Sequence, residues 1–515
     1  MSVLTKFVGN LLRPRAGAEP PAAGAAGEEL LQQAGAAAQG GRLEVALALY
    51  RECLRAHPRS LDACLGAAGV LVDLWLIDEA VAAYEEALAI APTAGPVFSA
   101  LLFHRHYLAP VDARRLFELH RAYGEMMRNA WPERAGDQTR PADSQRRLRI
   151  GYVSPNLSRH SVGYFIEPVL RNHDRSSFEV FCYYNHALAD DVTRRMREAA
   201  DGWREVAAID DDAVAQMVRE DRIDILIDLA GHSKGNRLGV FARRAAPVQL
   251  TWLGYPDTTG LAAIDSRITD HTADPSPGAE QRHSERLLRI ESGFLSYLPP
   301  ADAPLVKPRA PGAAVVFSSF NSLAKVNAES LRLWGRILAG VPGSRLVLKS
   351  SVLGFPDTVD RLLDAFERAG IDPAQVDLQG WISERQQHLE AYHDVDIALD
   401  TFPYNGTTTT CEALWMGVPV ITRAGEVHMS RVGASILHCV GLVELIARDD
   451  EQYVRCAINL ALDPGARAAL RAQMRARLAA SPLLDHAGFT RQLEVQLRHV
   501  WRAWCERRQT ASPGS

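Results

Sequence analysis

The chain has few lysines, no closely spaced cysteine pair and no long apolar run. Of its 57 basic residues only five are lysines, at positions 6, 234, 307, 325 and 349. The seven cysteines are odd in number and scattered, which favours reduced thiols over disulfides or a structural zinc site. No apolar run reaches the ~18 residues of a membrane span, and the first apolar run is too short for a signal peptide. These absences predict a cytoplasmic protein without a membrane partner.

The chain also has no large excess of positive or negative charge, and several catalytic motifs are absent. The net charge is only -5, so no basic surface indicates nucleic acid as a partner. HExxH, Walker A, GxSxG and complete GxGxxG motifs are absent, which argues against zinc proteases, P-loop enzymes, α/β hydrolases and dinucleotide oxidoreductases. With 515 residues and 47% apolar content, the chain is long enough for two or three globular domains that bind small molecules or other proteins.

A repeat is present near the N-terminus. Ala46, Tyr50 and Pro58 recur 34 residues later as Ala80, Tyr84 and Pro92. This is tetratricopeptide spacing, although a generic pair of helical hairpins is the alternative. Further helices over 97–107 and 113–130 are expected to continue the stack and to dock it onto the segment that follows. The sequence thus predicts a disordered leader over 1–27 and an all-α repeat region over 28–133.

After residue 147 short apolar runs alternate with amphipathic stretches, a pattern that predicts parallel strands joined by helices. Two such series imply two doubly wound Rossmann-like α/β domains, over 147–300 and 312–505, with a disordered tail over 506–515. Ligands of such sheets bind outside the carboxyl ends of the strands, so a cleft between the domains is expected. The expected strands are 148–153, 180–184, 223–229 and 248–253, then 315–318, 346–349, 376–378, 397–399 and 418–422.

The most informative segment is residues 399–419, where an apolar strand enters a Pro/Gly turn, four threonines and a short helix over 412–416. Gly406 with Thr407, Thr408 and Thr409 would place backbone amides and hydroxyls at a helix start, which is an anion-binding arrangement suited to a diphosphate. The alternative is an ordinary capping box formed by Thr409 and Glu412.

Other strand ends in the second α/β domain carry polar candidates. Lys325 lies between a strand and a helix capped by Asn327; a phosphate partner is favoured there, and an ion pair with Glu329 is the alternative. His388 lies on a helix that starts near Ser383 and Gln386, a possible capping box, and it either reaches the cleft or is a surface residue. The loop 424–431, with His428 and Arg431, follows the next strand and is expected to face the same cleft.

Two corners of the first α/β domain present histidines. His160 follows the first strand and His232 follows the third predicted one. The unperturbed pKa of a histidine suits a general base near neutrality, and each of the two could equally be a structural hydrogen-bonding residue.

Together these motifs resemble the catalytic region of the O-GlcNAc transferase and SPINDLY family, over roughly 147–503 with repeats in front. The resemblance implies a GT-B fold and an inverting, metal-independent glycosyltransferase that attaches one sugar to Ser or Thr of protein acceptors, with a nucleotide sugar as substrate and no cofactor. It implies that Lys325 holds the donor diphosphate and that the threonines grip the phosphates. It also implies that Ser322 and His388 line the nucleotide pocket, that Glu412 contacts the ribose and that His160 lies near the acceptor.

Two departures from the family pattern concern the donor. O-GlcNAc transferases have histidine at the place of Thr407 and aspartate at the place of Glu412, and the residues found here are closer to SPINDLY proteins, whose donor is GDP-fucose. UDP-GlcNAc is retained as the expected donor and GDP-fucose as the alternative. Two other classes of function stay open: a repeat scaffold with inactive GT-B domains, and an epimerase acting on free nucleotide sugars.

Overall fold

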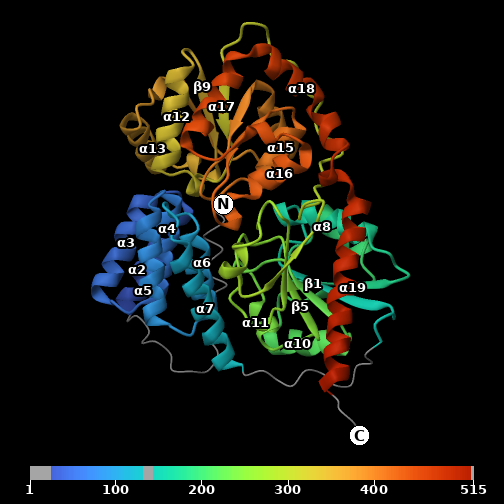
Figure 1. Cartoon of the computed structure of the whole chain (residues 1–515). Coiled ribbons are helices and arrows are strands. Elements are labelled where there is room, and N and C mark those ends of the chain that lie inside the picture. Colours follow the sequence, from blue (N-terminus) through green and yellow to red (C-terminus); the bar gives the residue numbers. More distant parts are fainter. Residues whose placement is uncertain (1–24, 132–142, 512–515) are drawn as a thin grey trace. The chain divides into compact units, whose positions relative to one another are not determined.

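The computed structural model describes residues 25–131 and 143–511, which form two compact units (Figure 1). The first unit contains 25–111, 302–425 and 444–474, and the second contains 112–131, 143–301, 426–443 and 475–511. Helix α2 begins at Ala25, so the predicted leader is helical over its last residues, and the rest of it lies outside the described residues. Within the described ranges, no helix is long and apolar enough to cross a bilayer.

The first unit begins with the predicted helical repeats. Ala46 and Ala80 are fully buried, and Pro58 and Pro92 each follow directly after a helix end, as the 34-residue spacing predicted. Tyr50 packs so closely on Gly66 that a Cβ there would lie 2.4 Å from its ring. The helices are α2 (Ala25–Gln39), α3 (Leu43–Ala56), α4 (Leu61–Asp73), α5 (Ile77–Ile90) and α6 (Gly95–Arg105).

Helix α7 (Ala113–Ala130) corrects the predicted extent of the repeat region. It belongs to the second unit, where its backbone lies directly against the loop that follows strand β5 (Val248–Thr251). A Cβ on Gly124 would lie only 1.8 Å from the carbonyl oxygen of Gly260, so glycine is needed at this contact. His120 on the same helix is hydrogen-bonded through Nε2 to the Tyr255 hydroxyl at 2.8 Å. The helix is therefore built into the first α/β domain.

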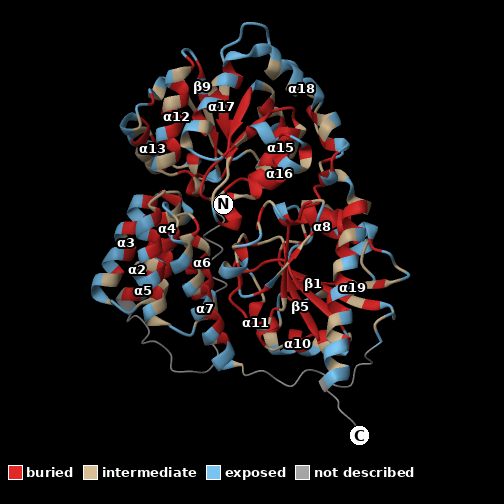
Figure 2. Ribbon diagram, in the orientation of Figure 1, coloured by how far each residue is buried: buried red, intermediate tan, exposed pale blue. Residues whose placement is uncertain are grey.

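The same unit contains a seven-stranded parallel sheet in the order β3-β2-β1-β4-β5-β6-β7. The short strands β3, β6 and β7 were not predicted, because each carries charged or polar residues in place of an apolar run. Helices with exposed outer faces flank the buried strands (Figure 2). The strands are β1 (Leu148–Ser154), β2 (Phe178–Tyr184), β3 (Gly202–Glu205), β4 (Ile225–Asp228), β5 (Val248–Thr251), β6 (Ser266–Thr269) and β7 (Arg286–Arg289). The helices that connect the first five strands are α8 (Ser161–Asn172), α9 (Asp191–Glu198), α10 (Asp211–Glu220) and α11 (Leu238–Ala242).

The C-terminal helix α19 (His486–Ala511) packs on this unit. Phe489 stacks on Trp252 beyond β5, with ring centroids 5.7 Å apart. The prediction of a disordered tail from residue 506 is wrong up to Ala511, since the helix continues and Arg508 lies over the Trp504 ring at 5.1 Å. Residues 512–515 lie outside the described residues.

The first unit contains a six-stranded parallel sheet in the order β10-β9-β8-β11-β12-β13. Five of its strands were predicted, and the two-residue edge strand β13 was not. Helices α12 and α17 pack together beside it, where the Trp334 indole donates to the Tyr453 hydroxyl at 3.2 Å. The strands are β8 (Val316–Ser319), β9 (Arg345–Lys349), β10 (Val376–Gln379), β11 (Ile397–Leu399), β12 (Val420–Arg423) and β13 (Ile446–Ala447). The main helices of this domain are α12 (Ala328–Gly340), α13 (Pro356–Arg368), α14 (Arg385–Glu390), α15 (Thr408–Trp415) and α17 (Asp450–Leu462). Helix α18 (Pro464–Ala479) begins in the first unit, and its residues from 475 onward belong to the second.

Candidate functional site

The six-stranded sheet brings several predicted residues together at one point of its edge. Strands β8 and β11 are neighbours, yet the chain leaves β8 towards β9 and leaves β11 towards β12, in opposite directions across the sheet. Such a switch in strand order opens a crevice at the carboxyl ends of the strands, where α/β sheets bind ligands. Lys325 follows β8, and the threonine segment follows β11. The topology therefore makes these two segments neighbours.

Asp400 organises the turn after β11. Its Oδ1 accepts hydrogen bonds from the backbone N–H groups of Thr401 (2.9 Å) and Gly406 (2.7 Å), and its Oδ2 accepts one from the Thr422 hydroxyl (2.7 Å). Burial raises the pKa of Asp400, and these three donors together with the Lys325 charge oppose that rise. The carboxylate therefore fixes the turn and supplies a buried negative charge close to Lys325.

Lys325 is held by the same turn. Its Nζ donates to the carbonyl oxygen of Asn405 at 2.8 Å and lies 3.9 Å from the ring centroid of Tyr404, a cation–π contact. The alternative ion pair with Glu329 is not formed, because Glu329 pairs with Arg423 at 2.7 Å. Lys325 is half-buried, and desolvation of its ammonium lowers its pKa to about 8, although Asp400 raises it. This cation is poised for an anionic ligand.

The threonines form the first turn of α15, which begins at Thr408, earlier than predicted. The capping-box alternative is wrong: no side chain caps this helix, and the Thr409 hydroxyl instead donates to Asn321 Oδ1 at 2.9 Å. A Cβ on Gly406 would lie 2.6 Å from Thr409 Oγ1, so the turn requires glycine. Thr408 Oγ1 is buried and has no hydrogen-bond partner among the described residues. An uncapped helix start with an unused hydroxyl is suited to bind an anion.

His388 and Glu412 form a second polar cluster in this unit. His388 Nε2 lies 3.1 Å from Glu412 Oε2, and the backbone oxygen of His388 accepts a hydrogen bond from Lys349 Nζ at 3.0 Å. Burial lowers the pKa of Lys349 to about 7, and its Nζ lies 4.0 Å from the Phe320 ring centroid. His388 is thus fixed from two sides.

Two further predictions about this edge have mixed outcomes. The capping box of Ser383 and Gln386 is wrong, since α14 begins at Arg385 without a side-chain cap. Asn327 caps α12 as predicted, accepting from the Ser330 N–H at 3.0 Å. Ser322 is exposed directly beside the Lys325 turn.

In the second unit, His160 follows β1 and His232 follows β4. These two strands are neighbours at which the order of strands along the sheet changes direction. His160 caps α8, its Nδ1 accepting from the Val162 N–H at 3.2 Å. The residue keeps solvent contact, but protein atoms crowd the ring, and this desolvation lowers the pKa of His160 to about 4. His232 is buried, hydrogen-bonded through Nε2 to the Thr259 carbonyl oxygen (2.9 Å), and its ring lies edge-on to Tyr123 at 4.6 Å. The two predicted base candidates thus occupy very different environments.

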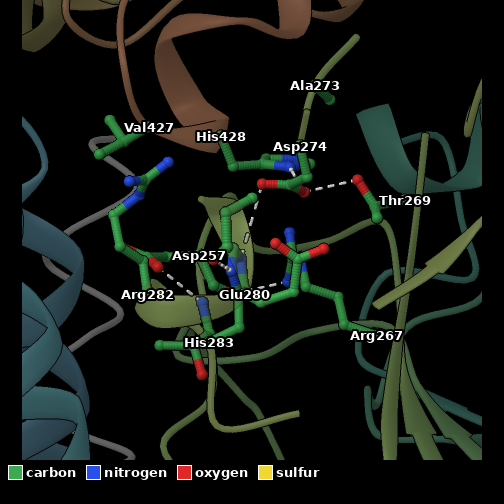
Figure 3. Close-up of polar contacts among 12 residues, drawn as sticks. Asp257, Arg267, Thr269, Ala273, Asp274, Glu280, Arg282, His283, Val427 and His428 are labelled. Atoms are coloured by element: carbon green, nitrogen blue, oxygen red, sulfur yellow. Dashed lines mark hydrogen bonds and ion pairs between the residues drawn. The ribbon is translucent and has the colours of Figure 1, made fainter. Parts of the chain in front are cut away.

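His428 and Arg431, which were expected to face the same cleft as Lys325, belong to the second unit. Figure 3 shows His428 facing Asp274, with Nδ1 and Oδ2 2.7 Å apart. The Thr269 hydroxyl donates to the same carboxylate at 2.5 Å. Arg431 Nε donates to the carbonyl oxygen of Thr272 at 2.7 Å. The segment 426–443, which continues the chain beyond β12, is therefore anchored within the second unit by polar contacts.

The chain has two parallel α/β domains in tandem, which follow a helical repeat region and have polar and charged side chains at the carboxyl ends of their strands. This arrangement defines the GT-B class of fold. The chain belongs to glycosyl transferase family 41, whose model matches residues 134–296 and 306–493.

Individual relatives agree with this assignment. A probable UDP-N-acetylglucosamine–peptide N-acetylglucosaminyltransferase SPINDLY of Petunia hybrida is 44% identical over 413 residues, 79% of this chain and 44% of that protein. The corresponding protein named SEC of Arabidopsis thaliana is 32% identical over 377 residues, 71% of this chain and 38% of that protein. The chain thus spans less than half the length of these relatives. A solved structure of a mutant O-GlcNAc transferase of Thermobaculum terrenum has a TM-score of 0.87 and 37% identity, covering 94% of this chain and 92% of that one.

Several residues of the site were not predicted from the sequence. Asp400 follows an apolar strand directly, and a carboxylate at that place is a signal that could have been used. Asn321 and Tyr404 gave no such signal, because their roles depend on contacts between residues 88 and 79 positions apart in the sequence.

Proposed function

We propose that this protein is an inverting O-glycosyltransferase that moves one sugar from a nucleotide-sugar donor to Ser or Thr hydroxyls of protein acceptors. The observation that carries the proposal is the pairing of the Lys325 ammonium with the uncapped start of α15 at one switch point. A lysine and helix-end amides together match a diphosphate in charge and in hydrogen-bonding capacity. The names of the relatives support the same activity.

The chemistry follows from where charge develops. The acceptor oxygen attacks the anomeric carbon as the bond between that carbon and the diphosphate breaks, so negative charge grows on the β-phosphate. Lys325 and the first amides of α15 stabilise this charge, and the Thr408 hydroxyl is available to donate to a phosphate oxygen. In this proposal the protein groups replace a divalent cation as the counter-charge.

The proton of the acceptor hydroxyl needs a base or a path to solvent. Of the two histidines, we assign this role to His160, because it is exposed to solvent whereas His232 is buried. The Nδ1 atom of His160 accepts the Val162 N–H, which places the proton of the neutral ring on Nε2, so His160 would take up the proton of the acceptor hydroxyl at Nδ1, after that hydrogen bond opens. His232 is buried and hydrogen-bonded to backbone, which suits a structural role.

For the donor we propose UDP-GlcNAc, in line with the names of the relatives. GDP-fucose is the second candidate, because Thr407 and Glu412 follow the SPINDLY pattern. In either case Ser322, His388 and Glu412 would line the nucleotide pocket, with Glu412 towards the ribose. The helical repeats are proposed to bind the protein acceptors.

Calorimetric titration of the full chain with UDP and with GDP tests the site and the base together. We expect one of them to bind, and Lys325→Met to weaken that binding strongly. Lys325→Ala should also lower turnover about a hundredfold, the effect of losing one transition-state donor worth about 3 kcal/mol. Binding of neither nucleotide, or full affinity in the lysine variant, would refute the proposal.

Transfer of radiolabelled sugar to lysate proteins in the presence of EDTA tests the reaction class. Incorporation into protein despite the chelator is expected. A free epimerised sugar would indicate an epimerase, and nucleotide binding without any product would indicate an inactive scaffold.

A further inference from the structure

The helical repeats contact the short segment that carries Lys325, and both lie in the first compact unit. The indole N–H of Trp75, in the turn between α4 and α5, donates to the carbonyl oxygen of Val326 at 2.7 Å. Ala324, on the other side of Lys325 in the chain, is buried in the apolar core formed by α4, α5 and α6. The residues directly before and after Lys325 are therefore both held by the repeats.

The backbone at Trp75 is unusual. Trp75 has a φ of 60°, in the left-handed region that bulky L-residues avoid. The residue 34 positions earlier, at the same place in the preceding repeat, is Gly41, with a φ of 74°. Glycine adopts this conformation without strain, and it is the usual residue just past a helix end. A tryptophan at this position is unfavourable for the turn itself, and what it adds is packing against the core of α4, α5 and α6 and the hydrogen bond to Val326.

A second contact reaches Lys325 from the end of α6. The ring of Tyr107 stacks on that of Tyr404, with centroids 5.6 Å apart and an interplanar angle of 19°. Tyr404 also contacts the Lys325 ammonium, which lies 3.9 Å from its ring centroid. The repeats thus support the aromatic ring on which the lysine rests, in addition to the backbone beside it.

We propose that Trp75 and Tyr107 are positioning residues for Lys325, so that the docked helical repeats form part of the donor site and set its affinity for a nucleoside diphosphate. The inference rests on the proposed function, in which Lys325 binds the donor diphosphate. Neither aromatic residue is assigned any contact with the nucleotide; each acts through the Lys325 segment or through Tyr404.

The test compares two single hydrogen bonds made by the same end of α4. Trp75→Phe keeps an aromatic ring but removes the indole donor to Val326. Thr358→Val is the matched control, because the Thr358 hydroxyl donates to the Asp73 carbonyl oxygen at 2.8 Å, also joining the repeats to the sheet domain, but away from Lys325. Tyr107→Leu removes the stacked ring, and Tyr107→Phe keeps it.

In calorimetric titrations of the full chain with UDP and GDP, Trp75→Phe and Tyr107→Leu should bind about fivefold more weakly than the wild type. Tyr107→Phe should restore the affinity, and Thr358→Val should stay within about twofold. Unchanged binding in Trp75→Phe, or an equal loss in Thr358→Val, would overturn the proposal.

A second readout needs no nucleotide. Because the chain has only five lysines, reductive methylation with a carbon-13 label gives few resonances, and Lys325→Arg identifies that of Lys325. Trp75→Phe should change the chemical shift and titration midpoint of this resonance, and Thr358→Val should not. An unchanged resonance overturns the positioning role, whereas a changed resonance in a chain that binds neither nucleotide upholds it and refutes the proposed function.

Discussion

Asp400→Asn should separate the structural role of this carboxylate from its charge. The asparagine has the same shape, and its carbonyl oxygen can accept from the N–H groups of Thr401 and Gly406 as Oδ1 does now. Its amide can donate to the hydroxyl oxygen of Thr422, which already faces Oδ2 at 2.7 Å. The turn is therefore expected to survive, while the negative charge near Lys325 is lost.

The magnitudes of the two effects differ. With most hydrogen bonds kept, Asp400→Asn should cost about 1 kcal/mol of unfolding free energy. Asp400→Ala leaves two amides and a hydroxyl without an acceptor, and should cost about 4 kcal/mol. The charge effect acts on Lys325: burial lowers its pKa to about 8 and Asp400 raises it, so removing Asp400 lowers it further. At pH 7.5 a smaller fraction of Lys325 then carries the charge that we propose binds the diphosphate.

The assay is the pH profile of kcat/KM, which reports groups of the free enzyme, together with urea unfolding of both variants. Asp400→Asn should show a lower maximum and an alkaline limb displaced to lower pH, with an unfolding midpoint close to that of the wild type. An unshifted limb would show that Asp400 does not control the charge of Lys325. A loss of stability as large as that of Asp400→Ala would show that the asparagine does not preserve the turn.

Three other outcomes are expected. Gly406→Ala should weaken nucleoside diphosphate binding about tenfold, because the added methyl would lie 2.6 Å from Thr409 Oγ1 and displace the start of α15; unchanged calorimetric affinity would remove this turn from the site. In the wild type, kcat/KM should fall as the pH rises through about 8, where Lys325 loses its proton. A kcat/KM that stays constant to beyond pH 9 would contradict that assignment. Asp274→Asn should lower the unfolding free energy by about 2 kcal/mol, measured in urea, because buried His428 loses its carboxylate partner; an unchanged midpoint would show that this pair contributes nothing to stability.

Local sequence patterns predicted the residues of the candidate site better than they predicted the residues that hold them in place. Lys325 and the threonine segment could be identified because each lies where an apolar strand meets a helix, a pattern contained in about a dozen consecutive residues. The contact of Trp75 with Val326 joins positions 251 apart in the sequence, and no local pattern carries it. The same limit explains the segment 426–443, which follows β12 in sequence but is held by Asp274 in the second unit.

The two sheets contain the same arrangement of an aspartate, a turn and a threonine. Asp228 ends the fourth strand of its sheet in chain order, and Asp400 directly follows the fourth strand of the other. Each accepts hydrogen bonds from two backbone N–H groups of the turn that follows and from a threonine hydroxyl, Thr251 or Thr422, of the next strand. Burial raises the pKa of both carboxylates, as expected when the same structure is built twice. The carboxylate therefore stabilises the turn but does not determine which functional side chain lies beside it.

What differs between the two sheets is the cation beside the turn. Lys325 lies on the Asp400 turn, resting on Tyr404 and bonded to Asn405, whereas the Asp228 turn leads to the buried His232. Each turn is organised by one carboxylate, so the two sheets differ in the side chain that the neighbouring loop places beside the turn. In the first unit the helical repeats help to place this side chain, Lys325, through Trp75 and Tyr107. Donor binding should therefore respond to changes in the repeats that leave every residue proposed to touch the nucleotide intact.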